Sequence, residues 1–356
     1  MMPEHIAYMR RCLQLAGSAA GKVAPNPMVG AVLVHRHRII GEGCHEYYGG
    51  PHAEVNCMRS VKEEDRQLVP ASTLYVSLEP CAHFGKTPPC ADLIIREGIQ
   101  RVIVGCRDPF PSVNGKGIEK LEKAGVQVEI SGIEEECREL NKRFFTFHTC
   151  HQPYVILKWA QTNDGFIGSN GKERLLISNA FTNRLVHKWR SEEAAILVGT
   201  RTALADNPSL TTRQWSGNNP LRILIDMELT LPAGLSLFDK TVPTLVFNRH
   251  KHTIEDLKAP GFDQCPLQYY QVTTDVSLVQ QMLHALYHLN IQSLIVEGGS
   301  KTLQSFIDEN AWNEARIITN TAFFSPGGVR APELGKAKVI KTERVQDDVV
   351  NWLRNV

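Results

Sequence analysis

The sequence predicts an α/β protein made of two domains. Short apolar and β-branched runs alternate with longer segments of helical periodicity along both halves of the chain, a pattern typical of layered α/β domains with a largely parallel sheet. With 356 residues the chain exceeds the usual size of one domain. A polar segment ending in proline, residues 148–153, separates the halves. We therefore expect domains at residues 1–147 and 148–356.

The elements of the first domain follow in order. A helix is expected over residues 4–20, where Ile6, Met9, Leu13 and Ala16 recur at helical spacing. The other helices are expected at residues 52–58, 91–97, 117–124 and 134–143, and the strands at residues 29–34, 39–42, 74–78, 101–106 and 126–130.

The second domain repeats this alternation. Its apolar runs are continuous, as in strands that helices cover on both faces. Strands are expected at residues 154–158, 194–198, 221–226, 244–248, 267–272 and 293–297, and helices at residues 180–190, 277–289 and 302–309. We expect this half to form a second sheet with its own core.

Composition excludes several classes of protein. The 39 basic and 38 acidic residues give a net charge of +1, so the chain lacks the basic excess of a nucleic-acid-binding protein, although a local basic patch stays open. Nine scattered cysteines do not form the disulfide framework of a small secreted protein and favour a cytoplasmic location. Neither a signal peptide nor an apolar run of the ~20 residues that span a membrane is expected.

The strongest functional signal lies in residues 51–90. His52, Cys81 and Cys90 offer one imidazole and two thiolates, a three-ligand zinc set that leaves the fourth position to water. Glu54 lies two residues beyond His52 and is a candidate to relay the proton of that water. This combination is the signature of zinc nucleobase deaminases.

The spacing of the two cysteines departs from that signature, in which two residues separate them. Here eight residues lie between Cys81 and Cys90, so this segment is expected to loop out and rim a pocket. Two alternatives stay open: a closed structural zinc site with His83 as fourth ligand, and two unrelated buried cysteines. The catalytic interpretation is favoured because a structural site has no use for Glu54.

Residues 24–117 resemble the deaminase half of the bifunctional deaminase/reductase family of bacterial riboflavin biosynthesis. The matching segments are residues 24–30, 41–45, 51–54 and 78–90. The resemblance implies a cytidine-deaminase-like three-layer fold. It also implies a substrate pocket lined by Asn26, His45, His83, Lys86 and Asp108. Phe110 departs from the family, which often has asparagine at this position, so Phe110 is expected only to stack or pack.

A glycine-containing turn follows the last expected strand of the second domain. Glu297-Gly298-Gly299-Ser300 precedes a helix, and helix N-termini favour phosphate. The segment lacks the GxGxxG spacing of a standard Rossmann site, and a tight strand-to-helix turn is the alternative.

Residues 158–165, 198–200, 204–213 and 296–299 resemble the reductase half of the same family. The resemblance implies a dihydrofolate-reductase-like fold that uses NADPH. The residues expected to hold NADPH are Ala160, Leu176, Thr202, Asp206, Gly299, Ser300, Lys301, Thr302, Leu303, Gln304 and Ser305. Those expected to face the substrate are Lys158, Arg174, Arg190, Leu210, Arg213 and Glu297.

Two residues depart from the reductase pattern. Leu176 replaces an aromatic residue expected beside the cofactor, and Arg174 replaces a small polar residue, so nicotinamide stacking is open and Arg174 is a candidate phosphate contact. Among the substrate-facing residues, Lys158, Arg190 and Arg213 suit a sugar phosphate. Lys158 and Asp206 are the candidates to polarise or protonate the sugar carbon.

The resemblance implies a bifunctional cytoplasmic enzyme with two cofactors, Zn2+ and NADPH. The first domain would deaminate a diaminopyrimidinone that carries a phosphoribosylamino group, and the second would reduce the ribosyl group to ribityl. A homo-oligomer, dimer or tetramer, is expected by analogy. Two alternatives stay open: a deaminase whose second half is a degenerate binding or assembly module, and a nucleic-acid deaminase with an appended binding module.

Overall fold

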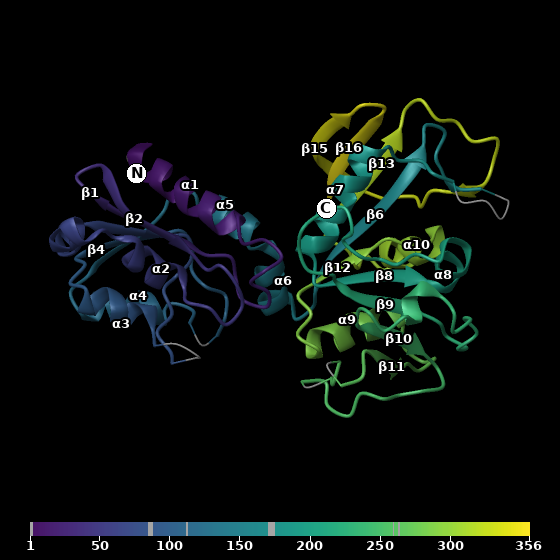
Figure 1. Cartoon of the computed structure of the whole chain (residues 1–356), viewed down its shortest axis with the longest axis horizontal. Helices are drawn as coiled ribbons and strands as arrows, with labels where there is room; N and C mark the ends of the chain where they lie inside the picture. The colour runs from purple at the N-terminus through teal and green to yellow at the C-terminus, as the bar shows by residue number, and fades with distance from the viewer. Residues whose placement is uncertain (1–2, 85–87, 112, 170–174, 259, 263) are drawn as a thin grey trace. The chain divides into compact units, whose positions relative to one another are not determined.

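The computed structural model describes residues 3–84, 88–111, 113–169, 175–258, 260–262 and 264–356. It divides into two compact units, Met1–Cys150 and His151–Val356 (Figure 1). The first unit ends with helix α6 (Lys142–Cys150). The sequence assigned residues 148–150 to a polar linker, but the helix continues through them. Phe144, Phe145 and Phe147 are buried on this helix and explain why it packs as part of the first unit.

A five-stranded sheet forms the centre of the first unit, in the order β2-β1-β3-β4-β5. β1 pairs antiparallel with β2 and β3, while β3, β4 and β5 are parallel. The strands are β1 (Gly30–His35), β2 (Arg38–Cys44), β3 (Thr73–Val76), β4 (Arg101–Val104) and β5 (Gln127–Ile130).

Helices cover both faces of this sheet, which makes three layers (Figure 1). Alternate strand residues point to opposite faces: Leu33 packs with α2, α3 and α4, whereas Val32 packs with α1, α5 and α6. The remaining helices are α1 (Pro3–Gly17), α2 (Ala53–Ser60), α3 (Cys90–Arg96), α4 (Lys116–Lys123) and α5 (Glu134–Leu140), with a 3-10 helix at Glu63–Ala71.

The helix expected over residues 134–143 is two helices, α5 and α6, separated at Asn141. The Asn141 side chain accepts the backbone N–H of Met28 at 2.8 Å and donates to the Met28 carbonyl at 2.8 Å. This pair of bonds ties the helix junction to the segment that precedes β1. The residues next to Asn26 are thereby held against the helices.

A nine-stranded sheet forms the centre of the second unit, in the order β11-β10-β9-β8-β12-β6-β13-β16-β15. Neighbours from β11 to β13 are parallel, and β16 and β15 add an antiparallel edge. The strands are β6 (Tyr154–Thr162), β8 (Ala195–Gly199), β9 (Leu221–Ile225), β10 (Thr244–Asn248), β11 (Leu267–Gln271), β12 (Ser293–Val296), β13 (Glu314–Asn320), β15 (Ala337–Val345) and β16 (Asp348–Asn355). A separate small ribbon pairs β7 (Phe166–Gly168) with β14 (Val329–Arg330).

Helices cover both faces of this sheet as well. α9 (Leu278–His288) and α10 (Ser300–Asp308) pack on one face around Leu157, and α7 (Ala180–Glu192) and α8 (Thr200–Asp206) pack on the other around Ile156. Three of these strands, β13, β15 and β16, were not predicted from the sequence. No helix in the described part of the chain is long and apolar enough to cross a membrane.

Candidate active sites

Three segments of the first unit bring their ends together. His52 directly precedes α2, Cys90 begins α3, and Cys81 lies in the loop between β3 and α3. The sulfurs of Cys81 and Cys90 lie 3.6 Å and 3.3 Å from Nδ1 of His52. All three donor atoms lie within 4.8 Å of one another. The three segments thus bring together the three residues that the sequence analysis named as candidate zinc ligands.

The donor set fits zinc, because one imidazole and two sulfurs make an open three-ligand site. A hydrogen bond from the Cys90 thiol, together with His52, holds the pKa of Cys81 well below its usual range, so this sulfur is disposed to bind a cation as thiolate. The backbone N–H of Cys90 also donates to it at 3.3 Å. His83 is exposed and lies outside the group of donor atoms, which speaks against the closed four-ligand site.

Glu54 stands beside these ligands in the first turn of α2. It is 4% exposed. Burial, and then the charge of Cys81, raises the pKa of Glu54. The arrangement therefore places a carboxyl group that can take up and return a proton next to the metal site.

Asn26 and His45 form the adjoining wall of this site. Nδ1 of His45 lies 2.9 Å from the carbonyl oxygen of Pro51, and Nε2 lies 3.0 Å from the amide nitrogen of Asn26. Because a carbonyl only accepts, His45 donates from Nδ1 and accepts from Asn26 at Nε2. Burial lowers the pKa of His45, which agrees with a neutral ring. The His45 ring stands edge-on to that of His52 at 5.6 Å.

Asp108 and Phe110 lie in the turn after β4. Asp108 is buried near Cys81, and burial raises the pKa of Asp108 to about 7. The Phe110 ring contacts the rings of His148 at 5.0 Å and His83 at 6.3 Å, so Phe110 packs into an aromatic cluster with α6. Lys86 lies outside the described residues.

Glu79, which precedes Cys81 by two residues, has no role predicted from the sequence. The structure buries it and surrounds its carboxylate with backbone N–H groups from residues 108–118. The only local signal in the sequence is a glutamate directly before Pro80 and Cys81. Its partners are too distant in sequence to be inferred.

In the second unit, three charged residues named from the sequence form one buried cluster. Arg190 donates to Glu297 from Nε at 2.9 Å and from Nη2 at 2.7 Å, and Nζ of Lys158 lies 3.6 Å from Glu297. Lys158 is on β6, Arg190 is on α7 and Glu297 follows β12. The cluster therefore lies at the carboxyl end of β12, and ligands bind beyond the carboxyl ends of strands in α/β sheets. Although burial disfavours the charge, Arg190 and then Lys158 lower the pKa of Glu297 to about 2.

Two glycines bring the beginnings of α8 and α10 together. A Cβ at Gly199 would lie 2.5 Å from Oγ1 of Thr302, and one at Gly299, which has φ +63°, would lie 3.1 Å from Oγ1 of Thr202. Neither helix has a side-chain cap at its start. The first N–H groups of each helix are therefore available to an anion, such as the phosphates of a dinucleotide. Ala160 is half-buried on β6.

The other residues of the expected cofactor and substrate sets differ in how far they are buried. Leu210 and Leu303 are buried in the two cores, so their side chains pack inside the unit. Gln304 donates to Asp308 and Glu333. The remaining members are Ser300, Asp206 and Ser305, which are half-buried, and Lys301 and Leu176, which are exposed. Arg174 lies outside the described residues.

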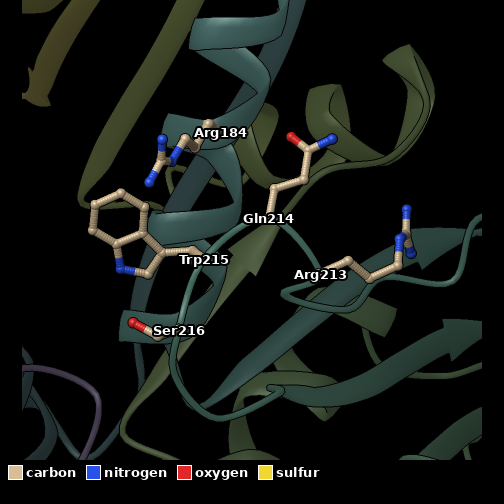
Figure 2. Close-up of a pocket in the computed structure, with 5 residues that line it drawn as sticks. All are labelled: Arg184, Arg213, Gln214, Trp215 and Ser216. Carbon is tan, nitrogen blue, oxygen red and sulfur yellow. The ribbon is translucent and has the colours of Figure 1, made fainter.

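Arg213 lines a surface pocket of about 460 Å³ between α7 and the loop that follows Thr212 (Figure 2). The other lining residues are Arg184, Gln214, Trp215 and Ser216. Figure 2 shows the Arg184 guanidinium beside the Trp215 indole, whereas Arg213 points away from that ring. Arg213 donates to Oγ1 of Thr211 at 2.8 Å, and Arg190 donates to the Thr211 carbonyl at 3.3 Å, which links Arg213 to the charged cluster.

Two protein-family models match consecutive parts of the chain. Residues 2–106 match the cytidine and deoxycytidylate deaminase zinc-binding region, and residues 153–349 match the RibD C-terminal domain. The deaminase match contains His52, Glu54, Cys81 and Cys90, and the fold class expected from the sequence is confirmed. A reductase-family domain over most of the second half argues against an unrelated nucleic-acid-binding module there.

Relatives and solved structures match nearly the whole length. The chain is 38% identical over 357 residues to a riboflavin biosynthesis protein RibD from Aquifex aeolicus, covering 98% of this chain and 97% of the relative. It is 36% identical to RibD from Bacillus amyloliquefaciens, covering 92% and 86%. A Thermotoga maritima structure, a diaminohydroxyphosphoribosylaminopyrimidine deaminase/5-amino-6-(5-phosphoribosylamino)uracil reductase, superimposes with a TM-score of 0.88 at 34% identity and covers 99% of both chains. The chain therefore belongs to the RibD family, with a zinc-binding deaminase domain followed by a RibD reductase domain.

Proposed function

We propose that this chain is a bifunctional enzyme of riboflavin biosynthesis. Its first unit hydrolytically deaminates 2,5-diamino-6-(5-phosphoribosylamino)pyrimidin-4-one to 5-amino-6-(5-phosphoribosylamino)uracil. Its second unit reduces the ribosyl group of that product to ribityl with NADPH. One observation carries the proposal: His52, Cys81 and Cys90 converge beside the buried Glu54, in a chain whose second unit is a RibD reductase domain.

In the first unit, zinc held by His52, Cys81 and Cys90 would lower the pKa of water and make it a nucleophile at neutral pH. Glu54 accepts a proton from the attacking water and returns it to the ring nitrogen next to the reacting carbon. A carbon–oxygen bond forms, the carbon–nitrogen bond to the amino group breaks, and Glu54 delivers the second proton to the leaving ammonia. The high pKa that burial gives Glu54 suits a group that carries a proton between two sites.

Asn26 and His45 position the pyrimidine for this attack. The neutral His45 ring holds one amide hydrogen of Asn26, which leaves the amide oxygen and the other hydrogen of Asn26 to pair with the donor and acceptor edge of the base. We propose that Asp108 and His83 complete the pocket, together with Lys86, which lies outside the described residues.

In the second unit, NADPH would supply a hydride to the sugar C1, with the ring-opened imine as acceptor. One carboxylate, Glu297, stands between the cations Lys158 and Arg190, and cationic side chains suit an anionic sugar phosphate. We propose that Arg213 also contacts the sugar phosphate, and so does Arg174, which lies outside the described residues. Lys158 and Asp206 are proposed to polarise and protonate the reacting centre.

The proposal extends to the surroundings of the enzyme. The substrate is a small phosphorylated molecule, and the near-neutral charge of the chain supports this over a nucleic acid. We place the enzyme in the cytoplasm, where free thiols such as Cys81 and Cys90 stay reduced. We also propose a homo-oligomer, dimer or tetramer. The exposed Val339 and Ile340 on the edge strand β15 support an interface in the second unit, which light scattering would test.

The test separates the two steps. The zinc-loaded protein is incubated with the diaminopyrimidine substrate without NADPH, and ammonia and the aminouracil are measured. NADPH is then added, and mass spectrometry follows the gain of two hydrogens. We expect stoichiometric ammonia before NADPH is present and the ribityl product only afterwards. Absence of ammonia from zinc-loaded protein would refute the deaminase assignment.

A further inference from the structure

One buried carboxylate of the first unit belongs neither to the metal ligands nor to the expected substrate contacts. Glu79 is 4% exposed. Its Oε2 accepts the backbone N–H groups of Asp108 at 3.3 Å and Gly115 at 3.0 Å, and its Oε1 accepts those of Gly117 at 3.0 Å and Ile118 at 3.3 Å. Across the described residues these partners are all backbone groups. Four donors therefore compensate one buried negative charge, as such a charge requires.

These bonds join two segments that both reach the deaminase site. Glu79 lies two residues before the ligand Cys81, and its partners span the turn that carries Asp108 and the start of α4. The segments touch closely: a Cβ at Gly117 would lie 1.9 Å from the carbonyl oxygen of Pro80. Gly115 has φ +84°, a conformation that glycine adopts readily, and its N–H reaches Glu79 from there.

The turn that carries Asp108 is anchored on two sides. Asp108 itself accepts the N–H of Phe110 at 2.7 Å, a bond within the turn that does not attach it to the rest of the unit. The Phe110 ring supplies one attachment through His148. The bond from the Asp108 N–H to Glu79 supplies the other, on the side of the metal ligands.

We propose that Glu79 is a positioning residue of the deaminase reaction. Its carboxylate holds Asp108 and residues 115–118 against the loop that bears Cys81 and so fixes the Asp108 carboxyl group in the substrate pocket. This inference rests on the proposed deaminase function. It assigns to Glu79 an effect on substrate binding that acts through Asp108 and not through the metal ligands.

The test replaces Glu79 with glutamine, which keeps the shape but turns one acceptor oxygen into a donor. Two of the four N–H groups then lose their acceptor. We expect the KM for the diaminopyrimidine to rise about tenfold with a smaller change in kcat, the pattern of lost substrate binding. Bound zinc and the reduction of pre-deaminated aminouracil should stay at wild-type levels. A purely structural role would instead lower the amount of active enzyme and leave KM unchanged.

A double-mutant cycle tests whether Glu79 affects KM through Asp108. If Glu79 acts through Asp108, then E79Q added to Asp108→Asn should raise KM by less than about twofold, because the two changes remove the same contact. Effects that multiply fully would overturn the proposal. Asp65→Asn is the matched control, since Asp65 is also a buried carboxylate of this unit but pairs with Arg38 at the far end of β2. It should leave KM unchanged.

A second variant guards against misfolding. Glu79→Asp keeps the charge on a side chain one methylene shorter, so it should fold and raise KM by an intermediate factor. An unchanged KM in a folded Glu79→Asp or Glu79→Gln protein would overturn the positioning role. If the wild-type enzyme itself releases no ammonia from the diaminopyrimidine, the proposed function fails instead, and the two failures are thereby distinguished.

Discussion

The buried cluster of Lys158, Arg190 and Glu297 makes a quantitative prediction about the second unit. Replacing Glu297 with glutamine removes a carboxylate that accepts two hydrogen bonds from Arg190 and lies 3.6 Å from Lys158. The side chains of Glu297 and Arg190 are 5% and 13% exposed. Two cations would therefore stay buried without their shared partner.

The size of the effect follows from the pKa. In the unfolded chain Glu297 titrates near 4.5, and in the folded protein its pKa is about 2. That difference corresponds to about 3 kcal/mol of stability at neutral pH, similar to the roughly 3–5 kcal/mol for breaking a buried ion pair. Because the folded-state pKa is the lower one, this stability is present above pH about 4.5 and is lost as pH falls towards about 2.

Tryptophan fluorescence during urea unfolding is the appropriate assay. The chain has five tryptophans, and the second unit, His151–Val356, contains all of them: Trp159, Trp189, Trp215, Trp312 and Trp352. The signal therefore reports the unit that holds Glu297. We expect E297Q to lower the free energy of unfolding by about 3 kcal/mol at neutral pH, with the difference from wild type shrinking in acid.

Glu228→Gln provides the matched control in the same unit. Glu228 pairs with Arg249 and His250, but its side chain is 53% exposed, and exposed ion pairs contribute little. Its replacement should leave the unfolding midpoint unchanged. If E297Q is as stable as this control, or if its difference from wild type does not depend on pH, the buried cluster does not stabilise the fold as argued.

Three further predictions concern the two sites. Removing zinc with a chelator should abolish ammonia release while reduction of pre-deaminated aminouracil continues, and loss of both activities would contradict separate sites. Leu176→Ala should change neither the unfolding midpoint nor the Kd for NADPH by more than about threefold, because its side chain is 74% exposed; a large loss of affinity in a fluorescence titration would show that Leu176 covers the cofactor. Phe110→Ala should lower the free energy of unfolding of the first unit by about 1–3 kcal/mol, because aromatic packing is lost. An unchanged unfolding midpoint would contradict that packing.

Much of this architecture is visible in the sequence because local periodicity reflects burial. The strand at Tyr154–Thr162 and the helix at Leu278–His288 lie where the apolar patterns predict them. β15 was not predicted from the sequence, for the converse reason. It is an edge strand with mostly exposed residues, among them Lys338, Lys341 and Arg344, and charged edge strands lack the alternation that marks a half-buried strand.

The residues of the two sites could likewise be predicted only in part from the sequence. The zinc ligands were identifiable because one histidine, two cysteines and a nearby glutamate together restrict the choice of residues. The pairing of Arg190 with Glu297 was not, since 107 positions separate them and each had been expected only to face the substrate. Glu79 was missed because its partners are backbone N–H groups 29 to 39 positions away, and no side-chain pattern indicates backbone donors.

The most direct test of the bifunctional assignment is NADPH oxidation with the diaminopyrimidine as substrate, in wild type and in Glu54→Gln. We expect oxidation by wild type and none by the variant, which should retain its zinc. Oxidation should return in the variant when pre-deaminated aminouracil is added, because the second unit is intact. If wild type releases ammonia but oxidises no NADPH even from aminouracil, the second unit is not a reductase. If the variant oxidises NADPH from the diaminopyrimidine at the wild-type rate, Glu54 does not carry the proton.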